Sequence, residues 1–237
     1  MDWRREESYA FTANLDGTGW AWQFLRRNPE YRRDYAWFIA TWRALETDYG
    51  VPPERDFFRW KQDPRAWRAE AELAACGTDA CPGENDQILI ECWMGAKWGF
   101  RQFPTDPALE QPETLAWREQ PIQVALIEPG ITGPWPRERI SLTFALALPL
   151  ELQLESARRQ LALSRHALAK AGKLPALTIR QGAPGWRIGL RILDGLEAGE
   201  DPTRLAVVLM RTDIQRDIDE ARALCTGGYL RLLKLPD

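Results

Sequence analysis

Residues 184–228 read PGWRIGLRILDGLEAGEDPTRLAVVLMRTDIQRDIDEARALCTGG, and this stretch is the most informative part of the sequence for the fold. Pro184 opens a first expected helix, which Ala198-Gly199-Glu200 ends. Asp201-Pro202 supplies an N-cap followed by a proline at the first helical position, the usual start of a helix. A tight link at residues 210–212 leads to a third expected helix, whose apolar residues keep helical spacing at Ile214, Ile218, Ala221 and Leu224.

Helix, short helix, tight turn and helix is the spacing of a trihelical helix-turn-helix. In such a unit the third helix lies in the DNA major groove and presents its outward side chains to base edges. Gln215 and Arg216 face outward and suit adenine and guanine edges, and nearby arginines suit phosphates. The candidate DNA-binding residues are Arg187, Arg191, Arg204, Arg211, Thr212, Gln215, Arg216 and Arg222.

The charge of the third helix argues against this interpretation. Residues 213–220 contain four carboxylates and one arginine, and carboxylates are repelled by phosphate. The chain as a whole is slightly acidic, with a formal net charge of −3, whereas DNA-binding domains typically carry a basic face. Residues 136–180, with eight basic and three acidic side chains, would offset this charge if they lay beside the third helix. DNA contact and protein contact therefore both stay open for this unit.

The N-terminal part is expected to be helical. Asn28-Pro29-Glu30 combines an N-cap, a first-position proline and an acid in the first turn. Aromatic and aliphatic residues keep helical spacing from there to Tyr49, and Gly50 ends the helix. A shorter helix is expected over residues 20–27. The aromatic residues of both helices fit a core, and a cage for a base or a cation is the alternative for Trp20, Trp22, Tyr31, Tyr35, Trp37 and Trp42.

The composition changes along the chain, because eleven of the twelve tryptophans precede residue 136. Further helices are expected over residues 64–75 and 86–94, the second with a strand as its alternative. Prolines recur between residues 97 and 150 and exclude long helices there. Two short extended runs, at residues 122–127 and 140–146, predict a small antiparallel pair. A long helix is expected from about residue 150 to residue 171.

The predicted architecture is mainly α with a small antiparallel β element. An aromatic-rich helical domain spans residues 1–96, and a Pro-rich connecting segment with short strands spans residues 97–149. A long helix and a C-terminal trihelical helix-turn-helix domain follow at residues 150–237.

Several classes of protein are excluded by the sequence. No apolar run approaches the ~20 residues of a membrane helix, and the N-terminus lacks the layout of a signal peptide. We therefore expect a cytoplasmic protein without a membrane partner. Cys76 and Cys81 stand too far apart for the usual zinc knuckle, and His166 lies on an expected amphipathic helix. No phosphate loop or nucleophile elbow is present.

We accordingly expect no enzyme activity, cofactor, metal or small-molecule substrate. An enzyme would need a pocket that pairs carboxylates such as Glu84, Asp86 and Glu91 with a metal ion.

Two parts of the sequence resemble known families. Residues 19–31, GWAWQFLRRNPEY, resemble the proteobacterial transcriptional-regulator-like domain, as do Trp3-Arg4 and Tyr9-Ala10-Phe11 before them. Lys97-Trp98-Gly99-Phe100, Asp106-Pro107 and Trp117-Arg118 are similar to the segment that commonly follows that domain. Residues 190–199 and 227–233 are similar to a second, helix-turn-helix family that was long labelled a domain of unknown function. Some of its members act as activators or antiactivators of excision in integrative and conjugative elements.

The resemblance implies a gene-regulatory protein of a bacterial mobile element or plasmid. The acidic third helix and the short link before it depart from the second family and suit an antiactivator-like role. The leading hypothesis is a DNA-binding regulator. The alternative is a protein-binding regulator or adaptor, acting through a partner, a homodimer or a nucleoprotein complex.

A second candidate patch flanks Pro29. It consists of four arginines, which form either a solvated face or a site for phosphate or an acidic partner: Arg26, Arg27, Arg32 and Arg33.

Overall fold

The computed structural model describes residues 2–69, 87–101, 103–119, 140, 142–171 and 178–236. Contacts between residues divide the chain into two units, one formed by residues 1–120 with 178–237 and the other by residues 121–177. The described part is mainly helical and contains one small two-stranded antiparallel sheet, which agrees with the predicted class, but residues other than those of the predicted pair form its strands. None of the described helices is long and apolar enough to cross a bilayer.

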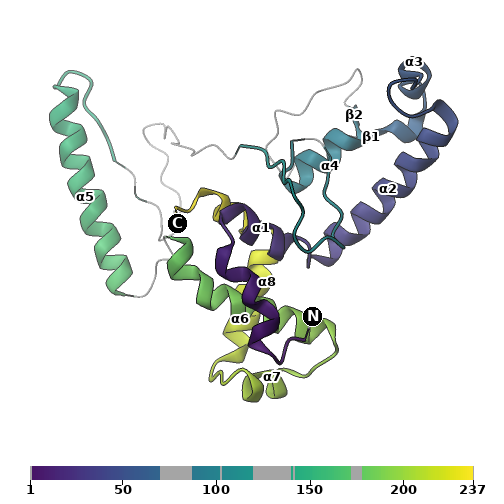
Figure 1. Ribbon diagram of the computed structural model, residues 1–237. Coiled ribbons are helices and arrows are strands. Elements are labelled where there is room, and N and C mark those ends of the chain that lie inside the picture. Colours follow the sequence, from purple (N-terminus) through teal and green to yellow (C-terminus); the bar gives the residue numbers. More distant parts are fainter. Residues whose placement is uncertain are drawn as a thin grey trace. The chain divides into compact units, whose positions relative to one another are not determined.

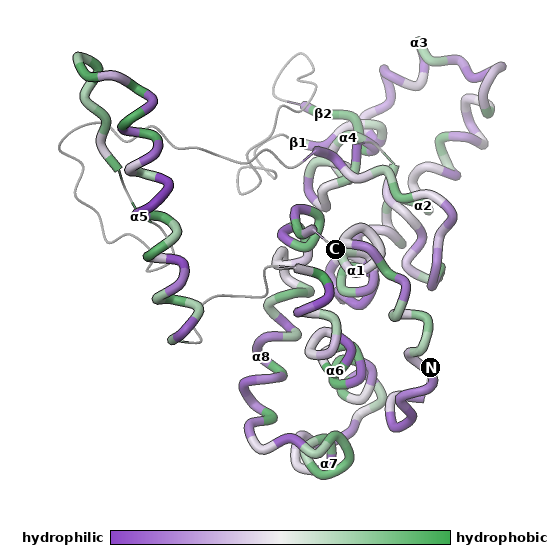
Figure 2. The backbone as a smooth tube through the Cα atoms, turned by 60° about the vertical axis from the view of Figure 1, so that its left-hand side comes forward, coloured by the Kyte–Doolittle hydropathy of each residue, from purple (hydrophilic) through white to green (hydrophobic). Residues whose placement is uncertain are grey.

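The two ends of the chain build one core together (Figure 1). Figures 1 and 2 both show α1 (Gly17–Leu25) beside α6 (Ile179–Glu197) and α8 (Ile214–Cys225), although the sequence separates them widely. The 3₁₀ segment η1 (Glu6–Asn14) contacts α6, and η4 (Gly228–Lys234) packs on α1. The N-terminal segment is therefore an integral part of the fold of the C-terminal helices.

Helices α6, α7 (Pro202–Val208) and α8 pack around a shared apolar cluster. Its buried members are Trp3, Ile192, Leu205, Leu209 and Ile218. The predicted inner stripe of α8 is confirmed, since Ile218, Ala221 and Leu224 are buried and Ile214 is half-buried. The predicted start of α7 is confirmed as well, because the Asp201 carboxylate accepts hydrogen bonds from the backbone N–H groups of Thr203 and Arg204.

Helix α6 begins at Ile179, so the start predicted at Pro184 is wrong. The hydroxyl of Thr178 accepts a hydrogen bond from the Gln181 backbone N–H and caps the helix five residues earlier. Gly182 leaves room for the ring of Trp186, from which a Cβ would lie only 2.1 Å away. Packing of this ring on Trp20, at 5.4 Å between centroids, stabilises a turn that proline alone would disfavour.

The domain boundaries predicted at residues 96 and 149 do not coincide with the two units. They follow the Pro-rich segment of residues 97–149, and the composition changes near residue 135, but Trp3 and Trp20 pack with residues of α6, α7 and α8 rather than only with their sequence neighbours. Composition records the local sequence and carries no information about such long-range contacts.

The rest of the first unit is rich in aromatic side chains. Helix α2 (Pro29–Tyr49) keeps its predicted bounds, with Asn28 as N-cap and Gly50 at its end. The elements that pack on α2 are α3 (Phe57–Trp60), η2 (Pro64–Ala66) and α4 (Ile90–Trp98). Strands β1 (Trp67–Ala69) and β2 (Gln87–Leu89) pair with each other and contact α4. In the sheet, Trp67 lies opposite Leu89 and Ala69 opposite Gln87.

The aromatic residues form a core rather than an open cage. Trp20, Trp22, Tyr31 and Trp42 are buried, while Tyr35 and Trp37 are half-buried. A buried arginine is part of this core: the Arg55 guanidinium lies 4.7 Å from the ring centroid of Trp42 and 4.0 Å from that of Trp60. It also pairs with Glu46 at 2.9 Å, which satisfies its charge.

Two local predictions are wrong. Residues 64–69, expected to begin a helix, form η2 and strand β1, because Asp63 caps only a single turn. The described residues of the run 140–146 form no strand, and Leu146 is 99% exposed. Alternation alone does not make a strand without a paired neighbour. The run at residues 122–127, its expected partner, and residues 70–75 lie outside the described residues.

The second unit contains the long helix α5 (Leu150–Lys170), which agrees with the predicted range. Leu152 and Leu163 are each about two-thirds exposed, and no described side chain of this helix is buried.

One buried ion pair connects the N-terminal segment to α6. The Arg27 guanidinium donates from Nε to Asp194 Oδ1 at 2.6 Å and from Nη2 to Oδ2 at 3.0 Å. Its Nη1 donates to the carbonyl and side-chain oxygens of Gln23, and the Tyr9 hydroxyl donates to Asp194 Oδ2. The Arg27 side chain is only 3% exposed, so the network replaces the water that the charge has lost.

Removing one partner of this pair should destabilise the fold strongly. We expect Asp194→Ala to lower the free energy of unfolding by about 3–5 kcal/mol, because Arg27 would stay buried without its counter-ion. Asp219→Ala, at an exposed position of α8, should change it by less than about 0.5 kcal/mol. Urea unfolding followed by circular dichroism measures both values. An Asp194→Ala protein as stable as the control would show that the pair does not connect the segments.

The same pair predicts a dependence on acidity. Burial raises the pKa of the Asp194 carboxyl, but hydrogen bonds and the charge of Arg27 outweigh it and hold this pKa below its ordinary value. The ionised carboxylate therefore stabilises the fold above the unfolded-state pKa of about 3.9, and this contribution is lost as the pH falls through the lower folded-state pKa. The stability difference between the wild type and Asp194→Asn should be largest near neutral pH and shrink below about pH 4. A difference that stays constant down to pH 2 in urea titrations would contradict this.

Candidate macromolecular interface

The α7–α8 corner is defined by an N-cap and a tight turn. The Asp213 carboxylate accepts a hydrogen bond from the backbone N–H of Arg216 and starts α8. The Arg211 N–H donates to the Ala206 carbonyl at 2.8 Å and closes the turn. Met210 has a φ of 51°, a left-handed conformation that is unusual for a residue with a side chain. The turn therefore places α8 firmly against α7 and α6 and leaves its other face open.

The open face of α8 is mainly acidic. Asp213, Asp219 and Glu220 are exposed there, together with Gln215 and Arg216. Arg216 pairs with Glu220 at 2.9 Å, and the Gln215 amide donates to Asp219 at 2.9 Å. The polar groups of this face are thus paired along the helix, with more carboxylates than guanidinium groups.

The candidate DNA-binding arginines outside α8 have other contacts. Arg187 donates to the hydroxyl of Thr12, and Arg191 donates to the carbonyls of Trp3 and Arg4, so both hold the N-terminal segment. The exposed Arg204 pairs with Glu200 at 3.1 Å. Arg211 binds Asp217 through two hydrogen bonds of 2.6 and 3.1 Å.

Thr212 and Arg222 are also exposed, at opposite ends of α8. The structure therefore places Arg211, Thr212, Gln215 and Arg216 around the start of α8, Arg204 in the first turn of α7, Arg187 and Arg191 on α6, and Arg222 near the end of α8.

An apolar patch, which the sequence analysis did not identify, adjoins the acidic face. Val207 is 74% exposed and Met210 is 91% exposed, and Val208 lies beside them at 36%. Figure 2 shows α7 as a hydrophobic segment of the tube. The sequence indicates this patch by its run of three apolar residues at 207–209, of which only Leu209 belongs to the core cluster. Adjacent apolar residues of this kind typically mark contact with another macromolecule.

The candidate patch around Pro29 is largely structural. Arg27 is buried against Asp194, and Arg26 donates to the carbonyl of Pro107 at 3.1 Å. Arg32 donates to the carbonyl of Arg26 and forms an ion pair with Glu197. Of these four arginines, Arg33 is exposed, Arg26 and Arg32 are half-buried, and Arg27 is buried.

The start of α2 and the end of α8 enclose a groove of about 780 Å³. Asn28 connects these two elements, since its side-chain oxygen caps α2 and its Nδ2 donates to the Cys225 carbonyl at 2.9 Å. Arg33 and Arg222, which are 189 positions apart in the sequence, both line this groove. Sequence reasoning assigned them to two separate patches and did not predict that they meet.

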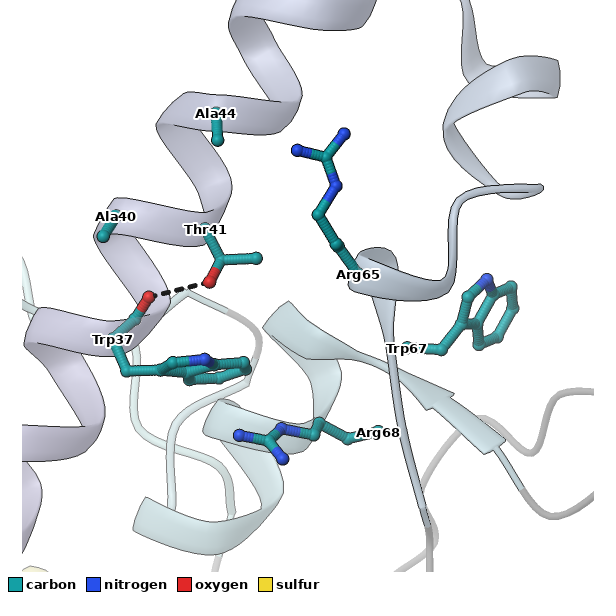
Figure 3. A pocket seen from close by; sticks show the side chains of 7 residues that line it. All are labelled: Trp37, Ala40, Thr41, Ala44, Arg65, Trp67 and Arg68. Carbon is teal, nitrogen blue, oxygen red and sulfur yellow. Dashed lines mark hydrogen bonds between the residues drawn. The ribbon is translucent and has the colours of Figure 1, made fainter.

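A second, shallower pocket of about 470 Å³ lies between α2 and the β1 segment (Figure 3). Ala40, Thr41 and Ala44 form its wall on α2, where their small side chains leave the hollow. Arg65 on its rim is paired with Asp48 and Asp63, both at 2.6 Å. Trp37, Trp67 and Arg68 complete the described lining, which contains no carboxylate, histidine or cysteine, so the pocket shows no arrangement of reactive groups.

The described cysteine and carboxylate side chains form no catalytic arrangement. Burial raises the pKa of the Cys225 thiol to about 12, and its Sγ contacts the Phe24 carbonyl, so the thiol is protonated at neutral pH. Burial also raises the pKa of Glu91. Glu84 and Asp86 lie outside the described residues, and the described ones contain no group of three potential metal ligands. The absence of enzyme activity stays a prediction.

One comparison with known proteins gave a match. Residues 2–50 match the family model of the proteobacterial transcriptional regulator-like domain. No curated protein and no solved structure matches the chain. The match covers η1, α1 and α2, and therefore includes Tyr9, Arg27 and Asn28, which contact the C-terminal helices. The likeness to this family is thus confined to the N-terminal segment and does not extend to α6–α8.

The turn at Met210 allows a direct test of its conformation. Because glycine adopts a positive φ without the Cβ clash, Met210→Gly should stabilise the protein by about 0.5–1 kcal/mol despite its greater chain entropy. Met210→Ala removes the same exposed side chain but keeps the Cβ, so it should not stabilise. Thermal unfolding of both variants decides the matter. Equal melting temperatures for the two would show that Met210 is not held in this conformation.

Proposed function

We propose that this chain is a bacterial gene-regulatory protein that acts by binding another protein through the α7–α8 corner. In this proposal α6, α7 and α8 are a helix-turn-helix unit in which the exposed helix no longer reads bases. The transcriptional-regulator-like match over residues 2–50 supports the regulatory role. The mobile-element or plasmid context comes from the resemblance of the sequence and belongs to the same proposal.

The observation that carries the proposal is the acidic outward face of α8. DNA affinity comes mainly from cations that contact phosphates, and a phosphate beside Asp213, Asp219 or Glu220 would be repelled. Arg211 and Arg216, which would have to offset this repulsion, are each paired with a carboxylate of α8. Such a face is compatible with a protein partner, because protein surfaces supply both signs of charge.

The apolar patch supports a protein partner independently of charge. Exposed side chains at Val207, Val208 and Met210 gain from burial in an apolar interface and gain nothing from a phosphate backbone. A small apolar centre with charged residues around it is the usual composition of a protein–protein interface.

DNA contact is the second candidate function, favoured by the exposure of Thr212, Gln215 and Arg216 around the start of α8. Exposed ion pairs contribute only ~0–1 kcal/mol, so Arg216 can leave Glu220 for a phosphate or a guanine at little cost. DNA binding would require at least two arginines to leave their carboxylates in this way, and the resulting attraction to DNA would have to exceed the repulsion between the carboxylates of α8 and the phosphates.

Site-specific photo-crosslinking in the native host distinguishes the two functions. A photoreactive amino acid at Val207 should give a discrete protein adduct, and the same group at the exposed Arg43 of α2 should not. Met210→Asp should abolish the adduct without lowering the melting temperature, because Met210 is 91% exposed and aspartate tolerates a left-handed backbone. Purified protein should not retard duplex DNA at low salt, either as wild type or as Arg216→Ala. Absence of an adduct at Val207, together with retardation that Arg216→Ala weakens, would replace the proposal with DNA contact.

A further inference from the structure

The groove between α2 and α8 has an unbalanced charge. Four arginines line it, Arg27, Arg32, Arg33 and Arg222, against the two carboxylates of Glu30 and Glu197. Arg27 is paired with Asp194 and Arg32 with Glu197, while Glu30 pairs with Lys97 at 2.7 Å. Within the described part of the chain, no carboxylate lies in ion-pair distance of the exposed Arg33 and Arg222. The groove therefore offers two cations to a ligand.

Apolar side chains complete the lining of the groove. Leu193 and Leu196 of α6 are half-buried there, and Pro29 lies at the start of α2. The side chain of Asn28 does not compete for a ligand, since its oxygen and nitrogen are both used in joining α2 to Cys225. A ligand thus meets leucine side chains in the groove and guanidinium groups from two different helices.

We propose that this groove binds an acidic segment of a partner protein, in which carboxylates pair with Arg33 and Arg222 and an apolar side chain packs on Leu193 and Leu196. This binding site is separate from the α7–α8 corner, so it does not depend on the function proposed above. Arginine suits the role because its planar guanidinium binds a carboxylate through two parallel hydrogen bonds.

The alternative occupant, a nucleic-acid backbone, fits the groove less well. Duplex-binding proteins typically make ~6–10 phosphate contacts, whereas the groove offers only Arg33 and Arg222 as cations without an ion pair among the described residues. Glu30 and Glu197 would repel a continuous row of phosphates, but single carboxylates of a peptide can avoid them. The leucines gain only from an apolar ligand group, which a phosphate backbone lacks.

The test uses the full chain and a short fluorescein-labelled peptide that repeats Glu-Leu-Asp, with binding followed by fluorescence anisotropy. The double variant Arg33→Ala/Arg222→Ala should lose at least about tenfold in affinity, because two charge-assisted hydrogen-bond pairs disappear. Arg43→Ala and Arg231→Ala are matched controls, since they remove exposed arginines of α2 and η4 outside the groove. Each control should change the affinity by less than about twofold.

Two altered peptides test the two parts of the ligand. Replacing Glu and Asp by Gln and Asn should abolish binding, and replacing Leu by Ser should weaken it while the carboxylates stay. No binding of the original peptide, or equal losses in the groove and control variants, would overturn the proposal. Binding of a short DNA duplex that requires Arg33 and Arg222 and is not displaced by the peptide would also overturn it, in favour of a nucleic-acid site.

Discussion

The ion pair between Arg27 and Asp194 is the interaction on which the rest of this structure depends. It joins the two-residue turn after α1 to the last turn of α6 through two hydrogen bonds, and the Tyr9 hydroxyl adds a third bond to the same carboxylate. A charge buried to this degree is tolerated only with a matched partner. The pair therefore specifies one arrangement of the N-terminal segment on the C-terminal helices.

Two surfaces of different chemistry follow from this arrangement. Because Arg27 fixes the end of α1, Asn28 reaches the end of α8 and places Arg33 and Arg222 on one groove. Toward the start of α8, exposed carboxylates face outward, and the apolar patch at the end of α7 is exposed beside them. One helix thus contributes an arginine-lined groove at its C-terminal end and an acidic face nearer its start. A regulator with these two surfaces could bind one partner segment in the groove and a second one at the α7–α8 corner.

The sequence predicted those features that depend on neighbours within one helix. Asn28-Pro29 and Asp201-Pro202 mark true helix starts, since capping requires only the next three residues. The apolar stripe of α8 identified its buried face for the same reason. Pro184 was misleading because the start of α6 depends on the Thr178 cap and on the packing of Trp186 against Trp20, a residue far away in the sequence.

The roles of the arginines were not predictable from local sequence. Arg26, Arg27, Arg32 and Arg33 look alike in the sequence, yet only Arg33 belongs to the exposed surface, while the other three are buried or half-buried. What separates them is the position of Asp194, Glu197 and the Pro107 carbonyl, each more than 70 residues away. Asp194 gave a weak signal of its own, as a lone carboxylate within the apolar run from Leu190 to Leu196.

Native-state hydrogen exchange of the full chain at increasing denaturant tests most directly whether the two ends of the chain are one cooperative unit. If the Arg27–Asp194 pair makes the two ends one unit, amides of α1, α6 and α8 will converge on a single opening reaction with the same free energy and the same denaturant dependence. If instead the amides of α1 opened separately, and at clearly lower free energy than those of α6 and α8, the N-terminal segment would only be an accessory to the C-terminal helices. The pair would then not hold the structure together.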